Sequence, residues 1–338
     1  MSELSDILPV ILVLVLGVAV AMYVVLDGFD LGIGILFPWY PKESERDQIM
    51  NSVAPFWDGN ETWLVFGGVS LWAGFPKAFG IILPSVYMPV IVLLLALIFR
   101  GVAFEFRWVA KPHHRKWDIA FAWGSTMAAF AQGLILGALL QGIKVEDGQF
   151  AGRPLDWLTP FSVMCGLALV CGYALLGATW IMMKTAGEVE QRARRFGVPL
   201  LLLMLGFLAL VSIWTPLQFE RVAQRWFSTP NIFFLVPVPL ATALAALLCW
   251  LGIRRNFAIL PFTTSMALFL LGFLGLLISY APYIVPYSMT IWQGASPPSS
   301  QLFYLIGAAI LLPMIIFYTA LVFWLFRGRI RPGDVNYH

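Results

Sequence analysis

The chain has 338 residues, 60% of them hydrophobic and only 12% charged, and its formal net charge is +3. Soluble domains carry about twice that share of charged residues, so the composition excludes a soluble globular protein and places most of the outer surface in lipid. No run of basic residues with interleaved aromatic residues indicates nucleic-acid binding. The three cysteines, Cys165, Cys171 and Cys249, lie in apolar segments without a CxxC pattern, which predicts neither a disulfide framework nor a thiolate metal site.

Long apolar segments follow one another along the whole chain. A helix needs about 20 apolar residues to cross the hydrocarbon core of a membrane, and nine segments approach or exceed that length. Lys77 alone marks the break between the second and the third, and the first is long enough to tilt or protrude. We therefore expect an all-α integral membrane protein, with one transmembrane domain over residues 1–338 and helices at 8–37, 60–78, 79–104, 118–142, 158–183, 196–216, 231–252, 258–280 and 302–326.

The basic residues between these segments are distributed unequally. Alternate loops place fifteen lysines and arginines on one side and five on the other, while Arg100 lies inside the third segment. Basic loops tend to stay in the cytoplasm, and an odd number of helices puts the termini on opposite sides. We therefore expect a periplasmic N-terminus and a cytoplasmic C-terminus.

Two aspartates lie near the end of the first segment, in the sequence DGFDLG at residues 27–32. If the helix continues through them, Asp27 and Asp30 share one face, and Gly28 and Gly32 form a small-xxx-small pair that allows close helix contact. Carboxylates at that depth are costly unless they are paired, hydrogen-bonded or facing water. We interpret them as a functional polar site, and the alternative is two acids at a helix end in the membrane interface.

A second acidic motif, WDGNE at residues 57–61, stands where the second helix should begin. Asp58 and Glu61 are one turn apart and fall on the cytoplasmic side of the predicted topology. Acids at a helix N-terminus are explained by capping and by the helix dipole. A proton entry point is the functional alternative, and the sequence leaves both interpretations open.

A third motif, FRGVAFEFR at residues 99–107, places Arg100 after an uninterrupted apolar run. A buried arginine needs a carboxylate partner or an anionic ligand, and we consider Asp58, Asp30 and Glu105 as candidates. The alternative is that the side chain reaches the cytoplasmic interface, about one turn away. Gln132, inside the fourth segment, is either a polar neighbour or an ordinary interhelical hydrogen bond.

Histidine is rare in this sequence. His113 and His114 lie in a basic loop and His338 is the last residue, so none falls within a predicted span. A haem in the membrane therefore finds no histidine axial ligand in this chain. We expect no metal site and no catalytic residue here, and any redox metal would be held by a partner.

The three polar motifs, taken in order, resemble subunit II of the cytochrome bd quinol oxidases, including the cyanide-insensitive branch. The similarity also covers the nine-helix layout, the near absence of membrane histidine and the late segment LPMIIFYTALVFW at residues 312–324. It thus extends over essentially the whole chain.

The resemblance implies a heterodimer in the bacterial inner membrane, in which subunit I carries two b-type haems, haem d and the quinol-oxidising loop. Subunit II scaffolds that chain and helps to deliver cytoplasmic protons for oxygen reduction. By motif position, Asp30 and Asp58 are the main proton-path candidates and Asp27 and Glu61 are weaker ones. Arg100 and Glu105 would stabilise them.

Three further points stay open at this stage. Small single-helix accessory subunits can join such complexes. A quinone or a lipid could be bound in this chain, with Trp57 and Trp63 as candidate contacts. The alternatives to the oxidase are a proton-coupled secondary transporter, which should show two related halves, and a purely structural membrane subunit.

Overall fold

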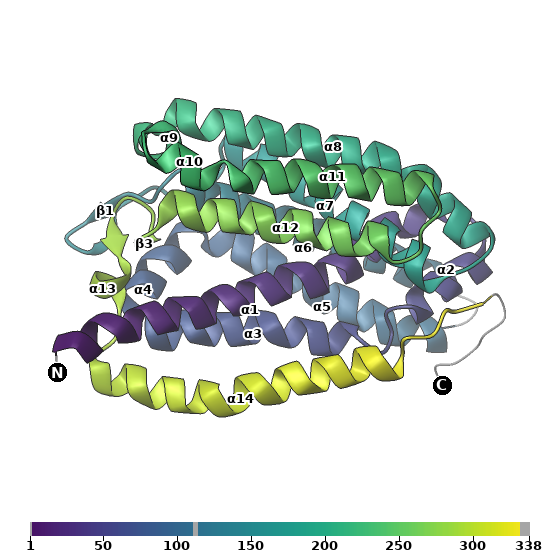
Figure 1. Cartoon of the computed structure of the whole chain (residues 1–338). Coiled ribbons are helices and arrows are strands. Elements are labelled where there is room, and N and C mark those ends of the chain that lie inside the picture. Colours follow the sequence, from purple (N-terminus) through teal and green to yellow (C-terminus); the bar gives the residue numbers. More distant parts are fainter. Residues whose placement is uncertain (1, 111–113, 332–338) are drawn as a thin grey trace.

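Long helices run side by side along a common direction in the computed structural model, which describes residues 2–110 and 114–331 (Figure 1). Short helices and two small hairpins connect them at the two ends of the bundle. The long helices are α1 (Ser2–Leu36), α3 (Trp57–Gly74), α5 (Tyr87–Val109), α6 (Arg115–Leu140), α7 (Pro160–Lys184), α8 (Glu188–Gln218), α11 (Pro237–Arg254), α12 (Leu260–Tyr280) and α14 (Pro298–Leu325).

The connecting elements include a 3-10 turn, η1, directly after α1. Both hairpins are antiparallel, β1 with β2 and β3 with β4. These elements are η1 (Phe37–Trp39), α2 (Glu43–Asn51), α4 (Pro76–Ser85), α9 (Glu220–Phe227), α10 (Asn231–Leu235), α13 (Ile291–Gly294), β1 (Val145–Glu146), β2 (Gln149–Phe150), β3 (Tyr283–Val285) and β4 (Met289–Thr290).

Eight helical segments of the described chain are long and apolar enough to cross a membrane, which confirms the all-helical membrane prediction. The helix α3 is not among the eight, although the sequence predicted a span at residues 60–78. It still lies lengthwise between α1 and α14 (Figure 1). The eight segments are Asp6–Trp39, Tyr87–Val109, Arg115–Leu140, Pro160–Lys184, Glu188–Gln218, Asn231–Arg254, Leu260–Tyr280 and Pro298–Leu325.

The second and third predicted spans have different boundaries in the structure. The break that the sequence placed at Lys77 falls two residues earlier, at Phe75, and a second break at Val86 divides the predicted helix 79–104 between α4 and α5. Pro76 explains the first break, because a proline disfavours helical geometry in the residue before it. Phe75 accordingly leaves the helical region, with φ −133° and ψ 61°.

Part of the core lies where α1 crosses α7. Phe29 stacks on Trp180 with ring centroids 4.1 Å apart, and both side chains are fully buried. A Cβ on Gly32 would come within 1.9 Å of the Tyr173 carbonyl oxygen, so only glycine permits this approach of the two backbones. This contact fixes the rotation of α1, the helix that carries Asp27 and Asp30.

The helix α14 lies at the edge of the bundle, and most of its surface is exposed. It begins at the end of the bundle where α1 begins and ends at the opposite end, near α2 (Figure 1). Arg107, Lys184 and Arg254 stand in the last turns of α5, α7 and α11. Basic residues therefore gather at the end of the bundle that contains α2.

Candidate functional site

Arg100 lies at the centre of a charged cluster between α1, α3 and α5. Its Nη1 lies 3.1 Å from Oδ1 of Asp27 and forms an ion pair with Glu61. Its Nη2 lies 3.9 Å from Oδ2 of Asp30. Three carboxylates from two helices thus surround one guanidinium, which we call the Arg100 cluster.

The local sequence explains how the cluster is built. On α1, Gly28 and Gly32 face α7, where the Tyr173 ring and backbone leave no room for a side chain. Asp27 and Asp30 then lie on the part of α1 that meets α3 and α5. On α6, Gly124 lets the backbone of α5 approach so closely that a Cβ would come within 3.0 Å of the Arg100 nitrogen.

Hydrogen bonds extend the cluster in two directions. Asn60 donates through Nδ2 to Oδ2 of Asp30 at 2.7 Å and to the Leu26 carbonyl at 3.3 Å. One turn before Asp27, the hydroxyl of Tyr23 accepts from Nε2 of Gln132 at 2.6 Å.

The hydroxyl of Tyr173 donates to Oε1 of Gln132 at 2.7 Å. Gln132 therefore joins two buried phenols through a hydrogen bond at each end of its amide. Of the two interpretations that the sequence left open for Gln132, interhelical hydrogen bonding is the one observed.

The acidic side chains of this site become less exposed from Asp58 through Glu61 to Asp27 and Asp30. Asp58 is exposed, the side chain of Glu61 is 25% exposed, and Asp27 and Asp30 are fully buried. Both carboxylate oxygens of Asp27, Oδ1 of Asp30 and Nη2 of Arg100 have no hydrogen bond of ordinary geometry to a described residue. Buried polar groups are normally satisfied, so these atoms keep hydrogen-bonding capacity that the described residues do not use.

Some sequence-predicted residues lie elsewhere. Of the three candidate partners of Arg100, only Asp30 belongs to the cluster. Asp58 and Glu105 are exposed and form no ion pair with a described residue. Glu105 does not pair with Arg100 because it comes five residues later and therefore lies on another side of α5. Asp27 and Glu61 are the partners that the sequence did not propose.

The two tryptophans proposed to contact a quinone or a lipid are both engaged within the chain. Trp57 stacks on Phe104 with ring centroids 5.3 Å apart. Trp63 is fully buried and packs edge-on against Phe66. Trp63 is thus enclosed within the bundle, and the quinone or lipid contact near these two tryptophans stays a prediction.

A second buried charge cluster was not foreseen. Nε of Arg107 donates to Asp118 on α6, and Nη1 donates to Asp47 on α2, both at 2.6 Å. Arg46 also approaches Asp118 at 3.5 Å. The sequence contained a signal, because Arg107 follows Arg100 by seven residues and so lies on the same face of α5 two turns later.

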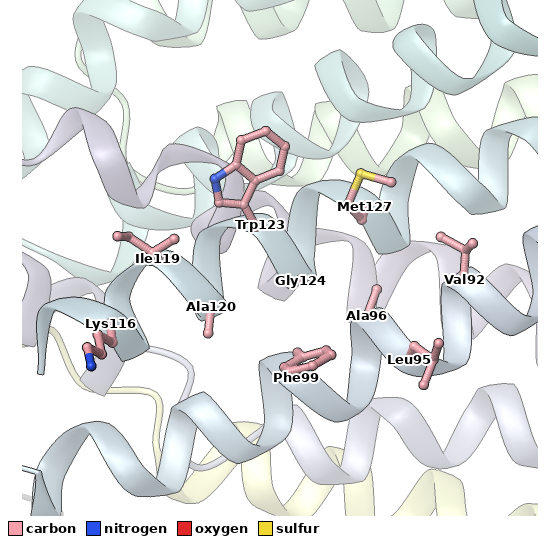
Figure 2. A pocket seen from close by; sticks show the side chains of 10 residues that line it. All are labelled: Val92, Leu95, Ala96, Phe99, Lys116, Ile119, Ala120, Trp123, Gly124 and Met127. Carbon is pink, nitrogen blue, oxygen red and sulfur yellow. The ribbon is translucent and has the colours of Figure 1, made fainter.

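An apolar groove opens between α5 and α6, with a volume of about 440 Å³. Figure 2 shows Phe99 and Leu95 on one wall, Trp123 and Met127 on the other, and Lys116 at one end. Neither Trp57 nor Trp63 lines it. None of the four charged side chains of the Arg100 cluster lines the groove either.

The described membrane spans contain no histidine, the residue that most often ligates haem iron. His114 is the only histidine among the described residues, and it lies directly before α6, within 3.5 Å of Glu43; His113 and His338 lie outside the described residues. No group of three or more His, Cys, Asp or Glu side chains in the described chain could hold a metal ion. The described spans therefore offer no histidine as an axial ligand to a membrane haem.

These features define a multi-span helical membrane protein with a charged cluster buried between its helices. The model of the family described as cytochrome bd terminal oxidase subunit II matches residues 8–326. The chain therefore belongs to the cytochrome bd terminal oxidase subunit II family.

Curated relatives and a solved structure agree with this assignment. The chain is 28% identical to cytochrome bd-I ubiquinol oxidase subunit 2 of Escherichia coli (strain K12), over 96% of this chain and 95% of the relative. It is 29% identical to cytochrome bd ubiquinol oxidase subunit 2 of Bacillus subtilis (strain 168), over 98% of both chains. A chain of the bd oxidase structure from Geobacillus thermodenitrificans shares the fold with a TM-score of 0.75 and 18% identity, over 94% of this chain and 98% of that one.

Proposed function

We propose that this chain acts as the haem-free subunit of a quinol-oxidising, oxygen-reducing complex and delivers cytoplasmic protons to its partner, subunit I. The relatives from Escherichia coli and Bacillus subtilis are named ubiquinol oxidase subunits, and a membrane quinol is the substrate class we propose for the complex. Family membership favours this function over the proton-coupled transporter.

The observation that carries the proposal is the composition of the Arg100 cluster. One guanidinium faces three carboxylates, and three of these four side chains are essentially inaccessible. Two uncompensated negative charges in a membrane-buried site would be very costly. The cluster therefore has the capacity to hold exchangeable protons, which a proton path requires.

The decrease in side-chain exposure from Asp58 to Asp27 and Asp30 gives the proposed proton path a direction. Asp58 stands at the accessible start of α3, Glu61 follows one turn later, and Asp27 and Asp30 form the enclosed end. Water bound at the unsatisfied oxygens of Asp27 and Asp30 would connect these groups. Arg100 positions the carboxylates and stabilises the ionised form of whichever one has lost its proton.

The orientation of the chain agrees with proton uptake from the cytoplasm. We propose a periplasmic N-terminus in the bacterial inner membrane, because the basic residues gather at the end of the bundle that contains α2. Glu61 and Asp58 stand in the first two turns of α3, close to that end. The entrance would thus face the cytoplasm.

Subunit I would hold the two b-type haems and haem d, which reduce oxygen with electrons from quinol. We propose that this chain holds no haem, because its described spans contain no histidine, and that its own work is to hold and move protons and to scaffold the partner. We also propose that small accessory subunits join the complex and that a quinone or a lipid binds to this chain.

The test is to express the oxidase complex with Asp30→Asn and with Asp58→Asn and to measure oxygen consumption with a quinol substrate. Normal haem spectra with strongly reduced turnover would support proton delivery by these residues. Normal spectra with normal turnover in both variants would refute it. Loss of haem and of assembly would instead indicate a structural role for the acids.

A purely structural role is the second candidate, because buried ion pairs can fix the register of helices. The second buried charge cluster, formed by Arg107 with Asp118 and Asp47 and here called the Arg107 cluster, is an example of such a structural role. It ties α2, α5 and α6 together through hydrogen bonds at 2.6 Å. The Arg100 cluster differs, because its excess of acids over bases makes a poor structural pair.

A further inference from the structure

A polar cavity of about 410 Å³ is lined by none of the residues of the two charge clusters. The elements that line it lie at the end of the bundle where α1 begins (Figure 1). The helix α9, the last turn of α12 and the loop around the β3–β4 hairpin form its walls. Arg221 and Arg225 lie one turn apart on α9 and both line the cavity. Its remaining lining includes Ser228, Asn231, Ser279, Tyr280, Tyr283 and Tyr287.

The two arginines are unlike the buried arginines of this chain. Arg100 and Arg107 face carboxylates, whereas neither Arg221 nor Arg225 forms an ion pair with a described residue. Glu220 is the nearest acid in sequence, but it accepts a hydrogen bond from Gln224 instead. The cavity therefore carries two positive charges and no negative one among its lining residues.

Each guanidinium uses only part of its donor capacity. Nη1 of Arg221 donates to the hydroxyl of Tyr283 at 3.1 Å, and Nη1 of Arg225 donates to the Ile278 carbonyl at 2.8 Å. A guanidinium has five N–H donors in a fixed fork. These two bonds hold the forks in place and leave donors free for a planar or tetrahedral oxyanion.

Tyr287 supplies an independent observation. Its hydroxyl is enclosed and, apart from the neighbouring Tyr280 hydroxyl, meets no hydrogen-bond partner among the described residues. The ring is held by stacking on Phe219 with centroids 5.1 Å apart, and the residue has a positive φ of 65°. A bulky residue adopts that backbone conformation rarely, and such strained conformations are concentrated at functional and ligand-binding sites.

We propose that this cavity binds a phosphate group, supplied by the headgroup of an anionic phospholipid. Two guanidiniums and a buried hydroxyl match the charge and acceptor capacity of a phosphate diester. The volume exceeds what one phosphate needs and leaves room for the glycerol part of a headgroup.

The surroundings favour a lipid over free phosphate as the source. The exposed aromatic side chains Phe227, Phe233 and Phe234 stand on α9 and α10 beside the cavity. Exposed phenylalanines favour the apolar part of a membrane, whereas Trp and Tyr, here Trp226 on α9 and Tyr283 in the cavity wall, are enriched at the level of the lipid headgroups. A phosphate group at that depth would therefore come from a lipid headgroup rather than from solution.

The experiment uses the detergent-purified oxidase complex containing this chain. Lipid retention is measured by native mass spectrometry with phosphatidylglycerol, with zwitterionic phosphatidylcholine and with inorganic phosphate as competitor. We expect one phosphatidylglycerol to be retained in preference to phosphatidylcholine. The variants Arg221→Gln and Tyr287→Phe should each weaken the binding of phosphatidylglycerol by about tenfold. A hydrogen bond to a charged group contributes about one order of magnitude to a dissociation constant.

The matched control is Arg255→Gln, which removes an exposed arginine near the other end of the bundle and should leave retention unchanged. Haem spectra and elution of the complex verify folding, and Tyr287→Phe keeps the stacked ring. Equal affinity in the wild type and in both cavity variants would overturn the site. Displacement of phosphatidylglycerol by inorganic phosphate at comparable concentration would overturn the lipid as its source.

Discussion

Gly32 of α1 and Gly177 of α7 meet backbone to backbone. A Cβ on Gly177 would lie 2.4 Å from the carbonyl carbon of Gly32 and 2.7 Å from the Ile33 nitrogen. No flexible side chain is available there to move aside. The contact determines how deeply α1 sits in the bundle, and so where Asp27 and Asp30 stand relative to Arg100.

The first prediction concerns this contact. Gly177→Ala should prevent the native approach of α1 and α7, because two backbones would have to separate. We expect a large loss of assembled complex and a lower midpoint of thermal unfolding, measured by haem retention in detergent. Gly206→Ala on α8 is the control, since no atom lies within 4 Å of the added methyl group. Equal melting of the two variants would contradict the role assigned to the contact.

The second prediction concerns Arg100 as the only cation of its cluster. Arg100→Gln leaves three carboxylates without a positive charge, and breaking a buried ion pair costs about 3–5 kcal/mol. We expect poor assembly of the complex, measured as the yield of haem-containing protein. Adding Glu61→Gln to Arg100→Gln should recover part of that yield, because it removes one of the unpaired charges. A double variant that assembles worse than Arg100→Gln would be evidence against this charge balance.

The third prediction concerns proton transfer through Glu61. Glu61→Gln keeps the shape of the side chain and removes its exchangeable carboxyl proton, and positioned acid–base groups contribute about 10²-fold or more to proton-transfer rates. We expect a decrease of that order in proton uptake from the cytoplasmic side of proteoliposomes, measured with a trapped pH dye. Glu146→Gln, in the exposed β1 strand, should leave uptake unchanged. Unchanged uptake in Glu61→Gln would remove Glu61 from the path.

The fourth prediction compares a buried ion pair with an exposed one. Asp118→Asn weakens the hold on the buried Arg107 and should lower the midpoint of thermal unfolding markedly. The exposed Lys42–Glu188 pair, at 2.5 Å, also links two helices but is screened by water, so Lys42→Gln should change the midpoint little. An equal decrease in both variants would show that burial does not decide the strength of these pairs.

The Lys42 pair also has a defined pH dependence. The hydrogen bond from Lys42 to Glu188 raises the pKa of Lys42 above its ordinary value of 10.5. The contribution of the charged lysine is therefore fully present below pH 10.5 and is lost as the pH rises through the raised pKa. In thermal unfolding at moderate salt, we expect the midpoints of the wild type and Lys42→Gln to differ slightly below pH 10.5. The two midpoints should become equal only in strongly alkaline solution.

Much of the architecture followed from the sequence alone. Composition and apolar length determined the membrane class and the position of most spans, because lipid requires about 20 apolar residues per crossing whatever the neighbouring helices are. Arg100, Asp27 and Asp30 could be recognised as polar residues within spans for the same reason. The clustering of basic residues at one end was likewise visible from the loops.

Only the tertiary structure decided which of these residues meet. The pairing of Arg100 with Asp27 and Glu61, the burial of Trp63 and the Arg107 cluster all depend on how each helix is rotated about its axis. That rotation is set by contacts between residues far apart in sequence, such as Gly32 with Gly177. A hydropathy pattern records which residues avoid water, but the partner of a buried charge is fixed by packing between helices.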